Sequence, residues 1–451
     1  MVVMDADTAL ESQIAQWRGY VERHQTISAA DADEMEDHLR SQISDLTAAG
    51  LMGDEAFLVA VKRMGNMNGI SREFAHEHSD RLWKQLVLMP AAPDARAGGP
   101  TRELWMVLAL AVGAAVAVKV GSALMGEQAF ARNAALFVLP FLTAYFAWKR
   151  QMSPRAAAAL SVPFVVAAAA LNGYPFRPEG ATEVIAAIHT PIVLWFVVGL
   201  AYAGGRWRSD RRRMDFIRFT GEWIVYLALL GIGGGVLVGL TVGAFDALGM
   251  DVEWVIESWV LPFGVAGAVV VSAWLVEAKQ NVVENIAPVL TRVFTPLTIL
   301  MLLVLLVAFA AAGTVVGVDR NLLILMDLIL VLVLGLVLYA ISARDPQAPA
   351  DLFDRLQLVL VLSALAVDLL MLVAMLTRIA EFGVTPNKVT ALGLNLVLLV
   401  NLTWSARLLA GFLRGRVPFS AAERWQTRYL PVFGLWAAVA LVVIPPAFDF
   451  V

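Results

Sequence analysis

Apolar stretches of about 17–27 residues recur from residue 103 onward, separated by short polar segments. Because a helix needs about 20 apolar residues to cross ~30 Å of hydrocarbon, each stretch predicts a transmembrane helix. We identify eleven, give or take one: 103–124, 130–148, 156–172, 185–204, 219–245, 254–276, 289–314, 321–342, 357–380, 387–413 and 429–448. The predicted fold class is an all-α, polytopic membrane protein. The third stretch is short, rich in alanine and interrupted by Pro163.

Residues 1–90 follow a different pattern, with frequent charges and no apolar run of spanning length. Apolar positions at helical spacing predict four short helices, the last three capped by Ser28, Asp54 and Ser71. The sequence thus predicts a helical domain at 1–90, a linker at 91–102 and a transmembrane helical domain at 103–451. The start, MVVMDADTALESQ, lacks the basic and apolar regions of a signal peptide, so we expect a cytoplasmic N-terminal domain.

Three blocks of the N-terminal domain carry a resemblance: EDHLRSQISDLTAAGL, DEAFLVAVKRMGN and SREFAHEHSDRLWKQL. In this order, over roughly residues 10–88, they resemble the bacterial permease prefix domain. That family is a small helical cytoplasmic module ahead of varied membrane proteins and is thought to be a signalling or regulatory unit. The resemblance implies that residues 1–90 regulate the membrane domain and bind a cytoplasmic signalling partner.

Basic residues predict the orientation in the membrane. From residue 81 onward, 21 Lys and Arg fall on the side of the N-terminal domain and five on the other. By the positive-inside rule, we expect a cytoplasmic N-terminus and a C-terminus on the outside. The resemblance to the bacterial permease prefix domain implies that the membrane is a bacterial inner membrane. One loop concentrates five arginines: Arg206, Arg208, Arg211, Arg212 and Arg213. This cluster either binds anionic lipid headgroups or only fixes the topology, and we favour the second interpretation.

Composition narrows the function classes. The 451 residues are 59% hydrophobic and 16% charged, which excludes an ordinary soluble protein. A net charge of −4 does not favour nucleic acid as a partner, and the absence of cysteine removes thiol chemistry and cysteine metal sites. Because no Walker, GxSxG or HExxH motif occurs either, we predict no enzymatic activity, no metal and no cofactor.

Polar residues inside the apolar stretches are the candidate functional residues, because each is costly in lipid unless it is paired or hydrated. At 1.5 Å per residue, Asp368 and Asn401 fall at the midplane of neighbouring antiparallel spans, so we expect them to meet. Asp327 and Asn395 fall further out, and Arg407 further in. We predict that these five residues line a substrate or ion site. The alternatives are a polar clamp between helices and, for Arg407, a side chain that snorkels to the interface.

Two further patterns concern packing and the inner surface. Gly231, Gly235, Gly239 and Gly243 leave one helix face without side chains, which predicts close helix packing within the subunit or across a homo-oligomer. The segment 277–292, EAKQNVVENIAPVLTR, is too polar to span. We interpret it as an inner loop with an interfacial helix broken at Pro288.

The connection RIAEFGVTPNKV between the ninth and tenth spans carries a second resemblance. Over roughly residues 215–415 the chain is similar to a large bacterial membrane family that is catalogued only as a domain of unknown function. Thr385 before Pro386 is expected to cap and start the tenth span. Arg378, Glu381 and Asn387 are expected to order this outer turn.

The sequence therefore favours a permease-like membrane protein that moves a small solute or ion by alternating access. In this hypothesis Asp368 accepts a proton or cation, Asn401 is a dipolar ligand, and residues 1–90 regulate transport. The alternative is an envelope sensor that relays a lipid, ligand or stress signal to a cytoplasmic partner. Membrane lipids are expected contacts in either case.

Overall fold

A computed structural model describes residues 10–11, 13–15, 17–18, 29–48, 51–65, 100–178, 180–278, 286–312 and 320–451. The chain divides into two compact units, Met1–Gly98 and Gly99–Val451, and this boundary falls inside the predicted linker. In the described ranges the regular structure is helical, without strands, which confirms the all-α prediction. The predicted caps Ser28 and Ser71, and the fourth helix of the N-terminal domain, lie outside the described residues.

The N-terminal unit has a hydrophobic core of its own. Its helices are α2 (Ala29–Ala48) and α3 (Gly53–Gly65). Further helical residues, between positions 10 and 18, precede α2 in the sequence. The buried core residues are Ile14, Trp17, Leu39, Ile43, Leu46, Ala56, Phe57, Ala60 and Val61. Arg18 and Arg40 both bond the Glu36 carboxylate, at 2.7 and 2.8 Å. These bonds hold the pKa of Glu36 below its ordinary value.

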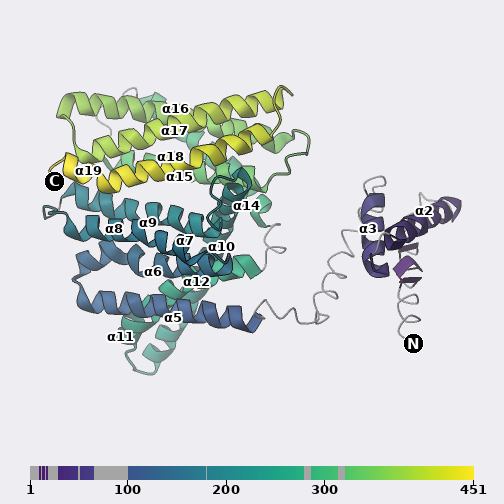
Figure 1. The fold of residues 1–451 in the computed structure, drawn as a ribbon. Helices are drawn as coiled ribbons and strands as arrows, with labels where there is room; N and C mark the ends of the chain where they lie inside the picture. Colours follow the sequence, from purple (N-terminus) through teal and green to yellow (C-terminus); the bar gives the residue numbers. More distant parts are fainter. Residues whose placement is uncertain are drawn as a thin grey trace. The chain divides into compact units, whose positions relative to one another are not determined.

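The membrane unit is a bundle of long helices that run roughly parallel and antiparallel to one another (Figure 1). Its first half comprises α5 (Pro100–Leu124), α6 (Glu127–Lys149), α7 (Pro154–Ala159), α8 (Ser161–Gly173), α9 (Ala181–Tyr202), α10 (Asp210–Ala247), α11 (Glu253–Val255), the π-helix η1 (Ile256–Val260) and α12 (Leu261–Ala278). The second comprises α14 (Ile286–Ala312), α15 (Arg320–Ala343), α16 (Leu352–Phe382), α17 (Pro386–Leu413), α18 (Ser420–Val442) and α19 (Ile444–Ala447). Ten spans in the described residues are long and apolar enough to cross a membrane. The protein is therefore a multi-pass membrane protein.

The eleventh predicted span, 429–448, corresponds to α18 and α19. α18 begins nine residues earlier than predicted, and its first turns, SAAERWQTR, are polar. This polar start leaves α18 outside the ten most apolar helices. It still packs along α9 and α17 as a member of the bundle.

The third predicted span is built from two helices. α7 ends at Ala159 and α8 begins at Ser161, so the break lies at Leu160 rather than at Pro163. Proline lacks an amide hydrogen, and its ring clashes with the carbonyl four residues earlier, here that of Ala159. The helix is therefore interrupted one turn before the proline, and Pro163 lies in the first turn of α8.

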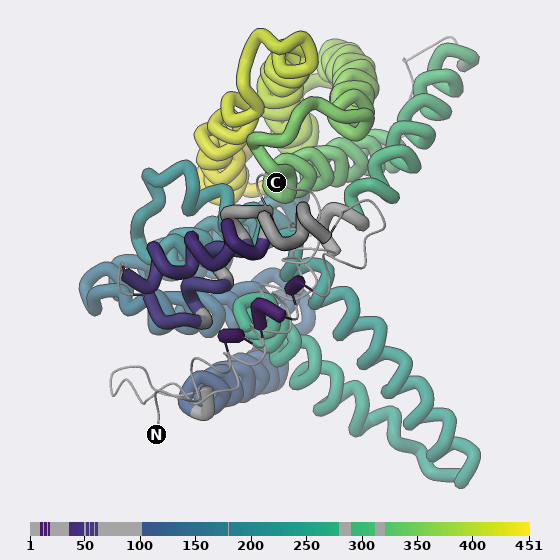
Figure 2. The backbone as a smooth tube through the Cα atoms, turned by 90° about the vertical axis from the view of Figure 1, so that its right-hand side faces the viewer, coloured from purple at the N-terminus to yellow at the C-terminus, as the bar shows by residue number. Residues whose placement is uncertain are grey.

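α10 is longer than predicted and leaves the bundle. It begins at Asp210 instead of 219, capped by Ser209, and its 38 residues make it ~57 Å long. Its second half diverges from most of the other helices (Figure 2), whereas α12, which follows it, packs along α5 and α6.

None of the described residues covers the glycine-rich face of α10. A Cβ atom added at Gly231, Gly235, Gly239 or Gly243 would meet nothing within 4 Å. The predicted packing of this face within the subunit is therefore wrong. Packing across a homo-oligomer stays a prediction.

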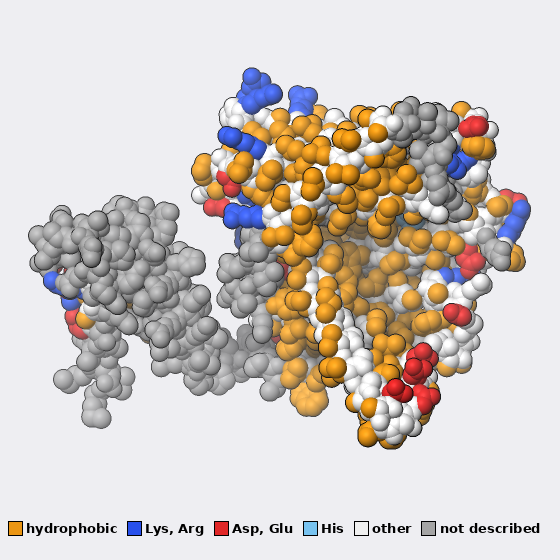
Figure 3. All heavy atoms as spheres, turned by 180° about the vertical axis from the view of Figure 1, so that it is seen from behind, with side chains coloured by type: hydrophobic (Ala, Val, Ile, Leu, Met, Phe, Trp, Pro, Cys, Tyr) orange, Lys and Arg blue, Asp and Glu red, His pale blue; other side chains and the backbone are white. Residues whose placement is uncertain are grey.

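Two hydrophobic clusters organise the membrane unit. One is built mainly from α5, α6, α8, α9, the start of α10 and α12, and the other mainly from α14 to α17. Met214, Leu338 and Phe433 pack against both. Hydrophobic side chains cover the middle of the visible face, and charged side chains lie toward its ends (Figure 3).

An ion-pair network joins four helices at the end of the bundle where α5 begins. The Glu277 side chain, 2% exposed, lies 3.0 Å from Arg150 and 3.6 Å from Lys149. Lys149 also pairs with Glu103 at 2.6 Å, and Arg150 donates to the carbonyl of Tyr202. The network thus connects α5, α6, α9 and α12. Glu277 was expected in a polar loop, but it is the penultimate residue of α12. Pro288 does not break a helix either, since it lies in the first turn of α14.

We predict that Glu277→Ala lowers the free energy of unfolding by about 2 kcal/mol, because it leaves the half-buried Arg150 without its anion and Lys149 with Glu103 alone. Thermal unfolding of the detergent-solubilised chain measures this change. Glu381→Ala, at an exposed position of α16, is the control and should change stability by less than about 0.5 kcal/mol. Equal melting temperatures of the two variants would contradict the prediction.

Candidate functional site

Asp368 lies in the middle of α16 and is fully buried. It stands ~24 Å from the start of the helix and ~21 Å from its end, by the rise per residue. Among the described residues, neither of its carboxylate oxygens has a hydrogen-bond partner. A carboxylate without partners at this depth is costly, so Asp368 is the strongest candidate for a functional group in the bundle.

Asp327 on α15 and Asn395 on α17 form a direct pair beside Asp368. The Asn395 amide donates to Asp327 Oδ1 at 2.9 Å, and it also donates to the Ala391 carbonyl. Asp327 is close enough to Asp368 for their carboxyl groups to interact electrostatically. The Asn395 amide lies 3.8 Å from the sulfur of Met375, one of the buried residues of α16. The site therefore gathers two carboxyl groups and one amide from three neighbouring helices.

Asn401 does not belong to this site, and its predicted contact with Asp368 is wrong. Its amide donates to Gln426 Oε1 of α18 at 2.9 Å. Gln426 donates to the Ser405 hydroxyl at 2.7 Å, which donates back to the Asn401 carbonyl. This closed ring of bonds clamps α17 to α18. It is the alternative that the sequence left open for polar residues in these spans.

Arg407 is also outside the site. Its side chain is exposed, and its guanidinium lies 5.0 Å from the ring centre of Trp404. Positions 395, 401 and 407 are six residues apart, which places them at intervals of ~120° around the helix. Counting residues predicts how far along α17 each residue lies, but not the direction of its side chain. The three side chains point to three different sides of α17.

A second polar pair lies on the same side of α16 as Asp368 but nearer the start of the helix. Gln357 donates to the Thr295 hydroxyl of α14 at 3.1 Å, and the other side-chain atom of its amide, Oε1, is buried without a partner. Eleven residues separate Gln357 from Asp368, which is close to three full helical turns. The sequence analysis missed this pair. The spacing of Thr291, Thr295 and Thr298 along one face of α14 is the signal that points to it.

Asp354 is a second buried carboxylate of α16, and it has hydrogen-bond and ion-pair partners. Its oxygens accept bonds from Arg344 at 2.7 and 2.9 Å, and it completes a capping box with Asp351 at the start of α16. Arg344 in turn stacks on Phe412 and Phe419. Asp354 is therefore fully paired, in contrast to Asp368.

The turn between α16 and α17 is ordered by Lys388, a residue that was not among the predicted ones. The Lys388 ammonium donates to the carbonyls of Arg378 and Gly383, at 3.1 and 2.7 Å. Thr385 caps α17 and Pro386 begins it, as predicted. Arg378 contributes its backbone carbonyl and stacks on Phe382, while Glu381 is exposed and Asn387 is half-buried in the first turn of α17.

The arginine-rich loop does not act as one cluster. Arg206, Arg208 and Arg211 are exposed. Arg213 donates to the carbonyls of Trp207 and Thr427 and so fixes the loop against α18. Arg212 instead lines a cavity together with residues of α6, α9 and α12.

Comparison with known proteins gives no match, since no family model, no curated protein and no solved structure is similar to this chain. Functional inference therefore rests on the geometry of the chain itself. Among the described residues, no group of three or more His, Asp or Glu side chains is arranged to hold a metal ion.

We predict that Asn401→Ala and Arg407→Ala have different effects on stability. Loss of the interhelical amide bond should lower the free energy of unfolding by about 1 kcal/mol, whereas the exposed Arg407 should contribute less than about 0.5 kcal/mol. Unfolding in detergent measures both. A larger effect for Arg407→Ala would contradict the assignment of the two faces of α17.

Proposed function

We propose that this protein is a permease-like membrane protein that moves a small solute or ion. The site of coupling is the set of Asp368, Asp327 and Asn395, and Asp368 accepts a proton or a cation. We place the protein in a bacterial inner membrane, with the start of α5 at the cytoplasmic face and the C-terminus outside. The basic residues at the α5 end of the bundle, including Lys149 and Arg150, support this orientation.

The unpaired state of Asp368 is the observation that carries the proposal. Glu277 and Asp354 have cationic partners, so this chain pairs buried carboxylates when they serve only packing. Asp368 has none, and the nearby Asp327 carboxyl adds repulsion. A bound proton or monovalent cation relieves both costs, which makes the site a place where such an ion is taken up.

Asn395 takes the role that the sequence hypothesis gave to Asn401. Its amide already orients the Asp327 carboxylate, and its own carbonyl oxygen is buried without a donor. A cation between the two aspartates would find this oxygen as an additional ligand. The site thus offers oxygen ligands from α15, α16 and α17.

Transport through this site requires a rearrangement of the helices. Gln357 marks a polar position on the same side of α16, but Val361 and Ala364 lie between it and Asp368 and are fully buried. No continuous polar path therefore joins Gln357 to Asp368 in this conformation. Alternation between inward- and outward-open states would hydrate the two ends of the path in turn.

We predict that water reaches position 368 during the working cycle. The chain contains no cysteine, so Asp368→Cys introduces a single thiol. Labelling with a membrane-impermeant thiol reagent, in intact cells and in inverted vesicles, should modify this position from at least one side. Gln347→Cys, in the exposed segment between α15 and α16, is the positive control.

Leu369→Cys is the matched negative control, because Leu369 is the next residue of α16 and faces outward. Labelling at position 368 that is no faster than at position 369, in folded protein and from both sides, would contradict a hydrated pathway. A purely structural role of Asp368 would then be the better interpretation.

Regulation by the N-terminal unit gives a separate prediction. Its own hydrophobic core supports a module that acts on the membrane unit. Deletion of residues 1–98 should change the labelling rate of Asp368→Cys by about fivefold or more, the usual size of a regulatory coupling. Equal rates with and without residues 1–98 would contradict regulation of this site, and the envelope-sensor alternative would gain support if position 368 is also inaccessible.

A further inference from the structure

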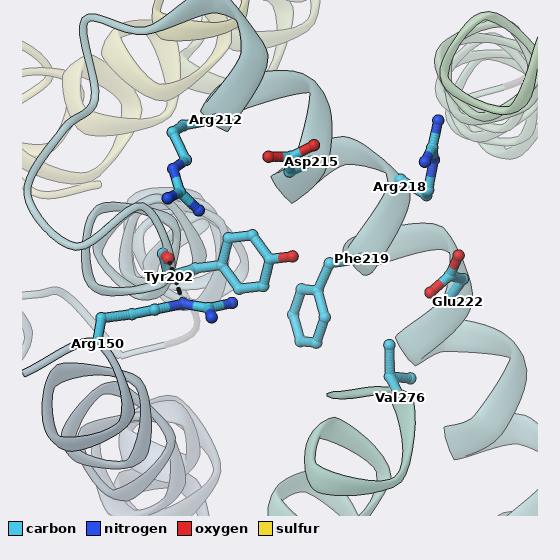
Figure 4. A pocket seen from close by; sticks show the side chains of 8 residues that line it. All are labelled: Arg150, Tyr202, Arg212, Asp215, Arg218, Phe219, Glu222 and Val276. Atoms are coloured by element: carbon cyan, nitrogen blue, oxygen red, sulfur yellow. Dashed lines mark hydrogen bonds between the residues drawn. The ribbon is translucent and has the colours of Figure 1, made fainter. Parts of the chain in front are cut away.

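A cavity of about 260 Å³ lies where α6, α9 and α12 end and α10 begins, apart from the Asp368 site. Figure 4 shows the eight residues that line it. They are Arg150, Tyr202, Arg212, Asp215, Arg218, Phe219, Glu222 and Val276. Three guanidinium groups and two carboxylates therefore share one small space. Its volume suits a headgroup-sized ligand better than a drug-sized one.

Two of the arginines are held in place by the protein. Arg150 donates to both Glu277 oxygens, at 3.0 and 3.1 Å, and to the Tyr202 carbonyl, and it stacks on the Tyr202 ring. Arg218 donates from Nε and Nη2 to the carbonyl of Ser342 on α15. Each thus uses only part of its donor set and presents the remainder in a fixed orientation.

Two further charged side chains of the cavity, Arg212 and Asp215, form no ion pair with another described residue. Arg212 and Asp215 are three residues apart on α10, a spacing that permits an ion pair. In the described part of the chain, however, neither side chain forms one. In Figure 4 the Arg212 guanidinium points toward the Tyr202 ring, and the Asp215 carboxylate lies apart from it. Both charges are half-buried and line the same cavity, so one ligand that carries both signs can pair with each of them.

The α10 face that lines the cavity continues toward the membrane as an uncovered apolar surface. Leu229, Val236 and Leu240 follow Glu222 by 7, 14 and 18 residues, spacings that return to the same side of a helix. These three side chains are 58%, 59% and 68% exposed. A charged cavity at the level of lipid headgroups is therefore followed directly by an apolar track.

We propose that this cavity binds the headgroup of a phospholipid that carries a phosphate and a primary ammonium, with its acyl chains along Leu229, Val236 and Leu240. The phosphate is bound by Arg212 and by the free donor of Arg150, whose guanidinium groups both lie beside Tyr202 in Figure 4. Arg218 points away from them and holds the Ser342 carbonyl. The ammonium is bound by Asp215. The proposal goes beyond transport and does not depend on it.

The charge pattern selects a zwitterion over a simple anion. An anionic headgroup would satisfy Arg212 but would leave Asp215 unpaired and repelled in the same small volume. A phosphate beside an ammonium satisfies both groups. The same chemistry exists in soluble phosphoethanolamine, but only the lipid also uses the uncovered track on α10.

Binding to the purified full-length chain in detergent tests this proposal by native mass spectrometry. The probes are phosphatidylethanolamine, phosphatidylglycerol with the same acyl chains, and soluble phosphoethanolamine. The wild-type chain should bind phosphatidylethanolamine at least about tenfold more tightly than phosphatidylglycerol, the size of one charge-assisted hydrogen bond. Asp215→Asn should abolish this preference, and Arg212→Gln should weaken both lipids by about tenfold.

Arg208→Gln is the matched control, because Arg208 is an exposed arginine of the same loop that does not line the cavity. It should bind both lipids like the wild type. Equal binding of the two lipids by the wild-type chain, or equal effects of Arg212→Gln and Arg208→Gln, would overturn the proposal. Displacement of the lipid by an equal concentration of phosphoethanolamine would overturn the assignment to a lipid and indicate a free zwitterion.

Discussion

A carboxylate that leaves water must find cationic or hydrogen-bonding partners, and in this protein Glu277 shows how far that requirement reaches. Its carboxylate, buried at the end of α12, lies within ion-pair distance of both Lys149 and Arg150. It thereby offsets the repulsion between these two cationic side chains, which are neighbours in the sequence. Lys149 then holds Glu103 of α5, and Arg150 holds the end of α9 through the Tyr202 carbonyl. One buried charge therefore fixes the ends of four helices whose apolar surfaces alone would permit sliding. In lipid, where apolar packing provides little direction, such polar contacts define which helix ends meet.

The same requirement identifies functional groups where it is not met. Asp354 has a bidentate arginine and a helix cap, so its charge is accounted for by the fold. Asp368 has neither, although it lies deeper, and the charged group that acts on it is another aspartate, Asp327. Arg212 and Asp215 are left open in a comparable way at the bundle end, facing one cavity. A fold that pairs its structural charges so completely makes the unpaired ones informative, because packing gives no reason for them. The two open sites differ in depth and charge, which suits an ion at one and a zwitterionic headgroup at the other.

Sequence pattern predicted the number and order of the membrane helices well, because length and apolar composition are local properties. The position of each polar residue along its helix was predictable for the same reason. Asp327 and Asn395, which were predicted at a similar level, do form a hydrogen bond. The direction of each side chain was not predictable, since it depends on how a helix is rotated against its neighbours. Asn401 has the expected depth yet faces Gln426 on α18. The apolar pattern also missed polar helix ends. This explains why α10 and α18 begin nine residues before their predicted positions, and why Glu277, at the end of α12, was assigned to a loop.

Arg218 links the two open sites through the packing of the membrane unit. It lines the charged cavity from α10, and its donors hold the Ser342 carbonyl of α15, the helix that also carries Asp327. Met214, Leu338 and Phe433 also pack against both hydrophobic clusters. A ligand in the proposed headgroup cavity would therefore lie beside the residue that joins α10 to α15. Asp327 lies near the start of α15 and Ser342 near its end. In the two proposals taken together, an ion beside Asp327 and a lipid beside Arg218 would thus act on opposite ends of one helix.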